Sequence, residues 1–117
     1  MEDILHKLNQ GLGVRGSMIV TVEGIVIKSL LGPELEEDRV AAMASAVLQE
    51  TQRCLNKLNL GMLSQFILTA MHGKMVFQDC GPAFLVVLTE KGINLDHTLI
   101  EIRGAAFKIK SKTKMED

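Results

Sequence analysis

The chain has 117 residues, of which 47% are hydrophobic and 23% charged, with a formal net charge of −1. This balance is typical of one soluble domain with one core and excludes a disordered chain, while the low charge and the lack of Trp and Tyr argue against a nucleic-acid surface. No apolar run approaches the ~18 residues of a membrane span, and the N-terminus lacks a signal-peptide pattern, so we expect a cytoplasmic protein.

The first part of the chain predicts a short helix followed by two strands. Apolar residues recur at helical spacing over residues 2–12, and glycines then interrupt the pattern. Residues 17–22 and 25–30 are rich in strand-forming residues. Between them, Glu23-Gly24 fits a two-residue hairpin turn, since Gly tolerates a positive φ.

Residues 34–60 predict one long helix. Acidic side chains gather at its start, where the helix dipole favours negative charge, and Gly61 is a suitable residue just past its end. At 100° per residue its apolar positions span about 160°, whereas covering a sheet needs only about 100°. The excess predicts contact with another subunit as well. The arc consists of Met43, Cys54, Val47, Val40, Leu58, Thr51, Ala44, Leu55, Leu48 and Ala41.

The rest of the chain predicts three strands and a closing helix. The strands are expected at residues 63–72, 75–79 and 83–89, and the third is apolar on both faces, which is typical of a central strand. Asn94 is expected to cap the last helix, and residues 111–117 to form a flexible Lys-rich tail. Such a basic end is either solvated or weakly attracted to an anionic membrane, but the tail itself contains no apolar anchor.

No motif in the chain predicts catalysis. Residues 11–16 match G-x-G-x-x-G, but a dinucleotide site needs this loop between a strand and a helix, and here it follows a helix, as a flexible connector would. Gly73-Lys74 lacks the other residues of a P-loop, and the three histidines do not share metal-ligand spacing. We therefore expect no enzyme activity, no catalytic residue, no cofactor and no metal.

The polar face of the long helix is either a solvated surface or a docking site, and the sequence leaves both open. Ala42, Ser45 and Ala46 are small neighbours on this face and would let another backbone approach closely. The expected partner-binding residues are Arg39, Ala42, Ala46, Gln49, Glu50, Arg53 and Lys57.

Several segments resemble the Roadblock/dynein-light-chain superfamily over residues 2 to about 110. They are the Glu23-Gly24 hairpin, the helix end Leu58-Asn59-Leu60-Gly61, the helix start Gly92-Ile93-Asn94-Leu95, and the closing motif with Leu99 and Arg103-Gly104-Ala105-Ala106. Asp96 stands where the family commonly has Gly. The length of the chain is most similar to that of the bacterial MglB type.

The resemblance implies an α+β sandwich in the order α-β-β-α-β-β-β-α, with a five-stranded antiparallel sheet and helices on both faces, as a single Roadblock-type domain over residues 1–110. It also implies an obligate homodimer, in which the strand at 63–72 pairs across a two-fold axis into one continuous sheet and two long helices lie antiparallel. The expected dimer interface is Ala41, Met43, Ala44, Leu48, Leu55, Ile67, Thr69 and Met71.

The resemblance further implies a non-catalytic regulator of a small Ras-like GTPase. In MglB-type proteins the dimer binds the GTPase MglA and promotes hydrolysis by rearranging the GTPase's own residues. Arg39 and Arg53 are therefore binding candidates and not arginine fingers. Two alternatives stay open: a scaffold that bridges larger proteins without affecting hydrolysis, and a small-molecule sensor, since related sandwich folds hold ligands.

Overall fold

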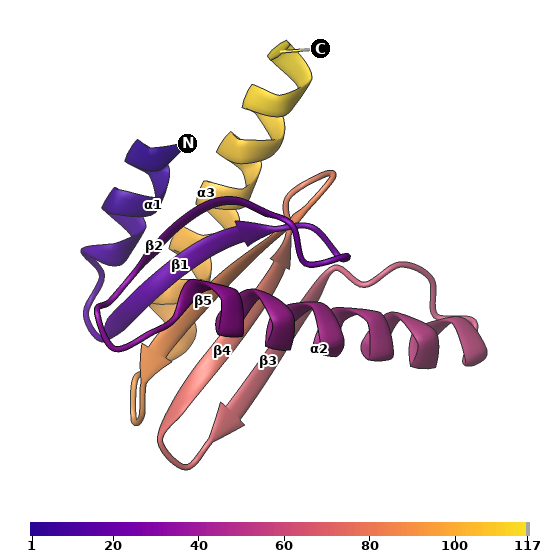
Figure 1. Cartoon of the computed structure of the whole chain (residues 1–117), viewed down its shortest axis with the longest axis horizontal. Coiled ribbons are helices and arrows are strands. Elements are labelled where there is room, and N and C mark those ends of the chain that lie inside the picture. The colour runs from indigo at the N-terminus through magenta and orange to yellow at the C-terminus, as the bar shows by residue number, and fades with distance from the viewer. Residues whose placement is uncertain (117) are drawn as a thin grey trace.

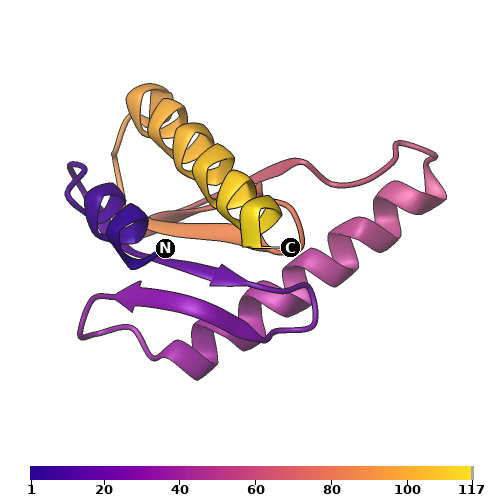
Figure 2. The same cartoon turned by 90° about the horizontal axis from the view of Figure 1, so that it is seen from above.

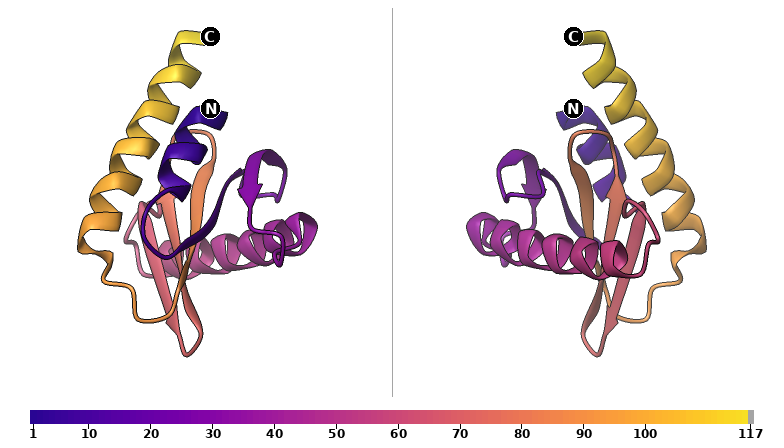
Figure 3. Two further views of the ribbon diagram at one scale, coloured as in Figure 1. Left: turned by 90° about the vertical axis from the view of Figure 1, so that its left-hand side faces the viewer. Right: turned by 90° about the vertical axis from the view of Figure 1, so that its right-hand side faces the viewer.

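Eight elements follow one another in the predicted order α-β-β-α-β-β-β-α. The computed structural model describes the backbone of residues 1–116 and the side chains of residues 1–113. The strands form one antiparallel sheet in the order β2-β1-β5-β4-β3. Helices α1 and α3 cover one face and α2 the other (Figures 1 and 3), which confirms the predicted α+β sandwich. The elements are α1 (Glu2–Asn9), β1 (Val14–Val20), β2 (Val26–Leu31), α2 (Glu37–Lys57), β3 (Gln65–Ala70), β4 (Gly73–Asp79), β5 (Phe84–Glu90) and α3 (Leu95–Glu116).

Strand β5 is the central strand, as its doubly apolar sequence predicts. It lies between β1 and β4, and its side chains alternate between two separate cores. Leu85 and Val87 are fully buried beneath α1 and α3, whereas Phe84 and Val86 face α2. The two cores explain why this strand has no polar face.

The connection between β1 and β2 is longer than predicted. It takes residues 21–25, in which the Thr21 N–H donates to the Ile25 carbonyl at 2.9 Å and the Gly24 N–H donates to the Thr21 carbonyl at 2.9 Å. The prediction of a two-residue turn is therefore wrong, because a register shift after Ile19 ends the regular pairing of β1 with β2 early. Gly24 does adopt the expected positive φ, +96°.

Helix α2 is shorter than predicted at both ends. Before it, Glu34 accepts hydrogen bonds from the Arg15 guanidinium at 3.2 Å. A backbone hydrogen bond and this guanidinium hold the pKa of Glu34 below its usual value. At the other end Asn59, and not Gly61, takes the position just after the C-cap with φ +57°, and Gly61 also has a positive φ, +85°. The Leu60 N–H donates to the Leu55 carbonyl at 3.0 Å, which completes a Schellman-type cap.

Helix α3 starts as predicted and extends further than expected. The Asp96 N–H donates to the Asn94 side chain at 2.9 Å, so Asn94 caps the helix. The helix continues to Glu116, and the domain boundary predicted at residue 110 therefore falls inside it. The glycine-rich loop after α1 leads directly into β1, where the Glu90 N–H donates to the Gly13 carbonyl at 2.8 Å.

Candidate protein interface

Helix α2 covers the sheet with only its first half. Val40, Ala41, Ala44 and Leu48 are buried against the sheet. The last turns of the helix project past the edge strand β3, so that no strand of this chain lies beneath them (Figures 1 and 2). The helix is thus longer than its own sheet can cover.

One side of α2 is apolar and largely uncovered. Met43 exposes 57% of its surface and Leu58 67%, and Cys54 is exposed between them. At 100° per residue these three side chains and the half-buried Val47 lie on one side of the helix. We call these four residues the apolar flank. Met43, Cys54 and Leu58 are the part of the wide apolar arc that the chain's own sheet leaves exposed, and Val47 packs partly against the core.

The sheet carries a second uncovered apolar area on the same face. Leu68 pairs in register with Met75, and both lie on the side of the sheet that α2 covers further along. Together with Leu88 and the exposed Met71 they line a shallow depression, which we call the open sheet patch. Exposed apolar surfaces of this kind mark contact sites with other proteins.

Strand β3 presents an unpaired edge beside that patch. It pairs only with β4, so the opposite row of backbone N–H and C=O groups is free to pair with another strand. Its sequence, residues 65–70, contains no charged residue. The other edge strand, β2, carries Lys28, whose amine lies 3.4 Å from the Glu2 carboxylate. Of the two edges, β3 is the less protected.

The predicted interface residues fall into two groups. Ala41, Ala44 and Leu48 expose 4% or less and belong to this chain's own core, so they offer no surface to a partner. Leu55 and Ile67 are half-buried, and Met43, Thr69 and Met71 are exposed. Sequence reasoning did not include Leu68, although its alternation with Phe66 along β3 places both on the α2 face of the sheet.

The predicted partner-binding residues share one exposed surface. All seven are exposed on the side of α2 that points away from the sheet, which we call the polar face: Arg39, Ala42, Ala46, Gln49, Glu50, Arg53 and Lys57. Ser45 does not belong to it, because it is buried and its hydroxyl donates to the Val22 carbonyl at 2.7 Å. Its role is to attach the β1–β2 connection to α2.

Three side chains of the polar face are already engaged in hydrogen bonds. The Arg53 guanidinium donates to both carboxylate oxygens of Glu50, and this hydrogen bond holds the pKa of Glu50 below its usual value. The Gln49 amide donates to the Ser45 hydroxyl at 2.9 Å and more weakly to the Val22 carbonyl at 3.2 Å. Arg39 lies 3.8 Å from Glu36, too long for a strong ion pair.

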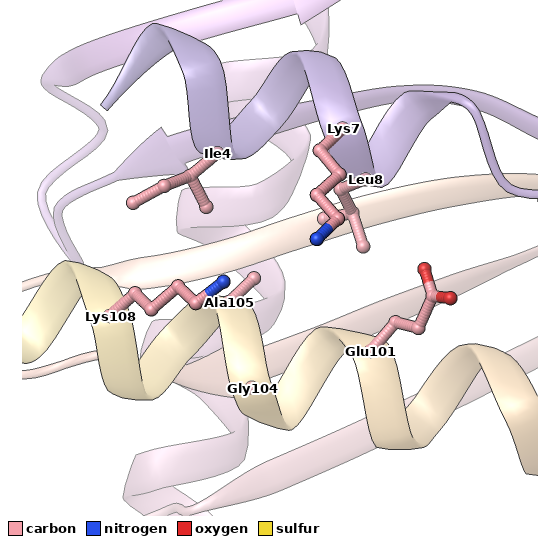
Figure 4. A pocket seen from close by; sticks show the side chains of 7 residues that line it. All are labelled: Ile4, Lys7, Leu8, Glu101, Gly104, Ala105 and Lys108. Atoms are coloured by element: carbon pink, nitrogen blue, oxygen red, sulfur yellow. The ribbon is translucent and has the colours of Figure 1, made fainter.

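The opposite layer contains a small pocket of about 200 Å³ between α1 and α3 (Figure 4). Ile4, Leu8 and Ala105 line its base, and Lys7 and Lys108 extend into the space between the helices. Among the described residues, no three His, Cys, Asp or Glu side chains come together as a metal site. None of the described helices combines the length and apolar composition that crossing a bilayer requires.

The chain is similar to a known protein family, to curated relatives and to solved structures. The family model of the Roadblock/LC7 domain matches residues 1–89. An uncharacterised protein of Methanocaldococcus jannaschii is 37% identical over 95% of this chain and 97% of its own length. The Roadblock/LC7 domain of Streptomyces avermitilis superposes with a TM-score of 0.88 at 14% identity, covering 97% of this chain and 98% of that one. MglB of Myxococcus xanthus gives a TM-score of 0.88 at 12% identity, with 97% and 94% covered.

Proposed function

The chain belongs to the Roadblock/LC7 family, and on this premise we propose that it forms a homodimer that binds a small Ras-like GTPase and modulates its GTP hydrolysis. The observation that carries the proposal is the unfinished packing of α2. The apolar flank and the open sheet patch lie on the same side of the molecule, next to the free edge of β3. A second copy of the chain would cover the apolar flank and the open sheet patch and would pair with the free edge of β3.

The dimer follows from pairing β3 with its own copy. Antiparallel pairing of two identical edge strands requires a two-fold axis perpendicular to the sheet, so both α2 helices lie on the same face of a continuous sheet. The projecting half of each α2 then extends over the other copy's sheet. There Cys54 and Leu58 of the apolar flank cover the open sheet patch, with Leu68 and Met75. Met43, nearer the start of the helix, packs against the side of the partner's α2.

The polar face supports the proposed docking of the GTPase. In this dimer the two polar faces point outward on the same side and form one extended surface. Ala42 and Ala46 permit a partner to approach the helix backbone closely, and Arg39 and Lys57 supply charge at either end of the surface. Complementary charge of this kind sets orientation and association rate more than affinity.

The chemistry of the polar face favours modulation through the GTPase's own residues. A direct arginine finger has to reach the transferring phosphate, but Arg53 is held by Glu50 along its own helix. The chain also has no G-x-x-x-x-G-K-[ST] phosphate-binding loop, because its single Gly-Lys pair, Gly73-Lys74, is followed by Met75. Its action would therefore be to select or stabilise one conformation of the GTPase.

The test uses the purified chain and the Ras-like GTPase of the same organism, loaded with GTP or GDP. Calorimetry measures affinity, and a single-turnover assay measures hydrolysis with and without the chain. Ala46→Arg should leave the dimer folded and weaken binding more than tenfold, or about 1.4 kcal/mol. Gln10→Arg places the same charge on an exposed site of the opposite layer and should bind like the wild type.

The outcomes separate the proposal from its alternatives. Binding with a changed hydrolysis rate supports a regulator, whereas binding without any change supports a pure scaffold. No binding in either nucleotide state, from a folded dimer, refutes both. The sensor alternative has weaker support, because the charged residues lining the α1–α3 pocket, Lys7, Glu101 and Lys108, are at least partly exposed and do not converge in a buried site.

A further inference from the structure

Helix α3 has an uncovered apolar ridge on its outer side. Ile100 exposes 66% of its surface and Phe107 72%, and Gly104 between them has no atom within 4 Å of where a Cβ would lie. The three positions lie on one side of the helix, opposite Ile102 and Ile109, which are buried in the core. Phe107 has the largest side chain among the exposed hydrophobic residues.

Cations flank the ridge on both sides. Residues 102–113 contain four cationic side chains and no acidic one. All four are exposed, and only Lys110 has an acidic neighbour, the Asp79 carboxylate at 3.6 Å. From α1, Lys7 extends toward α3 across the groove that it shares with Lys108 (Figure 4). The four cations are Arg103, Lys108, Lys110 and Lys112.

We propose that the outer side of α3 docks the protein on an anionic phospholipid bilayer. Phe107 enters the headgroup region, and the flanking cations contact lipid phosphates. The attraction of a few cations to anionic lipid is weak, and inserting a single apolar ridge contributes little binding free energy. In interfacial helices the two contributions act together. The chain as a whole carries a net charge of −1, so the attraction is confined to this side.

The acidic residues on α3 fix which part of the helix makes the contact. Asp96 and Glu101 lie in its first half, where Glu101 lies 2.9 Å from the His97 side chain. Repulsion from anionic lipid would keep that half away from the surface. The next acidic residues in the sequence are Glu116 and Asp117, so the contact is centred between the two acidic groups, on Phe107 and Lys108.

The position of α3 leaves the rest of the molecule free. It lies on the opposite face of the sheet from α2, so a protein docked on lipid presents the polar face of α2 away from the bilayer (Figure 3). The proposal does not depend on the GTPase. If the homodimer forms, its two-fold axis places both α3 helices on the same side, and the two contacts reinforce each other through effective concentration.

The test is co-sedimentation of the full chain with vesicles of phosphatidylcholine alone or with 30% phosphatidylserine, at low and high salt. We expect binding only to the serine-containing vesicles, weakened by salt. Lys108→Glu should weaken it at least fivefold, from the loss of one cation near the surface. Phe107→Ala should weaken it by about as much. Lys91→Glu makes the same charge change at an exposed turn before α3 and should bind like the wild type.

Each other outcome overturns the proposal. Equal binding to both vesicle types would show that charge has no part, and equal binding by Lys108→Glu and Lys91→Glu would place the contact elsewhere. Absence of binding by a chain with a native melting curve would remove the site altogether. Light scattering without vesicles measures self-association of the chain. If the chain forms assemblies larger than the dimer, and Phe107→Ala abolishes them, the ridge binds another copy of the chain and not lipid.

Discussion

Met43→Glu is expected to separate the two copies of the dimer while leaving each chain folded. Met43 exposes 57% of its surface within a single chain, so the substitution leaves the chain's own core intact. In the proposed dimer the same side chain is covered by the partner. The substitution therefore tests assembly and folding independently.

The expected loss can be worked from this exposed fraction. Full burial of a Met side chain contributes about 1.5–3 kcal/mol, so the part left for the partner is about 1–2 kcal/mol, and the two-fold axis doubles it. Leaving an unpaired carboxylate in the interface costs several kcal/mol more. The sum exceeds about 4 kcal/mol, which raises the dissociation constant at least a thousandfold.

Sedimentation over a range of concentrations measures this constant, and a melting curve reports folding. Met43→Leu is the matched control and should remain a dimer. Leu48→Glu gives the contrast, because Leu48 exposes only 1% and its replacement should unfold the chain. The reasoning fails if Met43→Glu sediments as tightly associated as the wild type, or if Met43→Glu and Leu48→Glu lose structure to the same degree.

Three further outcomes are expected. A thiol reagent should modify neither cysteine of the intact dimer quickly: the partner covers Cys54, and burial raises the pKa of the Cys80 thiol to about 12. In Met43→Glu, Cys54 alone should become reactive, and rapid labelling of Cys54 in the wild type would place the interface elsewhere. The stability that the neutral Cys80 thiol contributes should be complete below its ordinary pKa of 9.0 and fall as the pH rises toward 12, a decline that Cys80→Ala should lack in parallel melts. Gly24→Ala should lower the unfolding free energy by about 1–3 kcal/mol in denaturant titrations, because an L residue is strained at φ +96° and its Cβ would lie 3.3 Å from the Ser45 Cβ.

Periodicity was enough to predict the existence and order of every element in this chain. The doubly apolar run in β5 indicated a central strand, and the wide apolar arc of α2 indicated more surface than one sheet needs. Both signals are local, because burial on one or two faces repeats along the segment itself. The residues at which elements end depend more on contacts with distant parts of the sequence. Glu34, for example, lies before α2, where its carboxylate accepts a hydrogen bond from Arg15, nineteen residues earlier.

The sequence alone could not predict that the first half of α2 is buried on the sheet and that its last turns project past it. A wheel projection assigns Ala44 and Met43 to the same arc, but it does not say which side of that arc the sheet covers; the structure buries Ala44 and leaves Met43 exposed. Ser45 shows the same limit. Its small side chain resembled part of a docking surface, yet the β1–β2 connection folds back and binds its hydroxyl. The apolar ridge of α3 was readable in principle, since Ile100 and Phe107 lie opposite the buried stripe.

The separation of buried and exposed apolar residues on α2 has a consequence for how such chains diversify. Residues that hold the chain together, such as Ala44 and Leu48, alternate on a single helix with exposed residues of the proposed interface, such as Met43 and Cys54. The second set can change after gene duplication without disturbing the first. A duplicated copy can thus acquire a new pairing preference while keeping its fold, and a family of mutually selective subunits can arise from one scaffold.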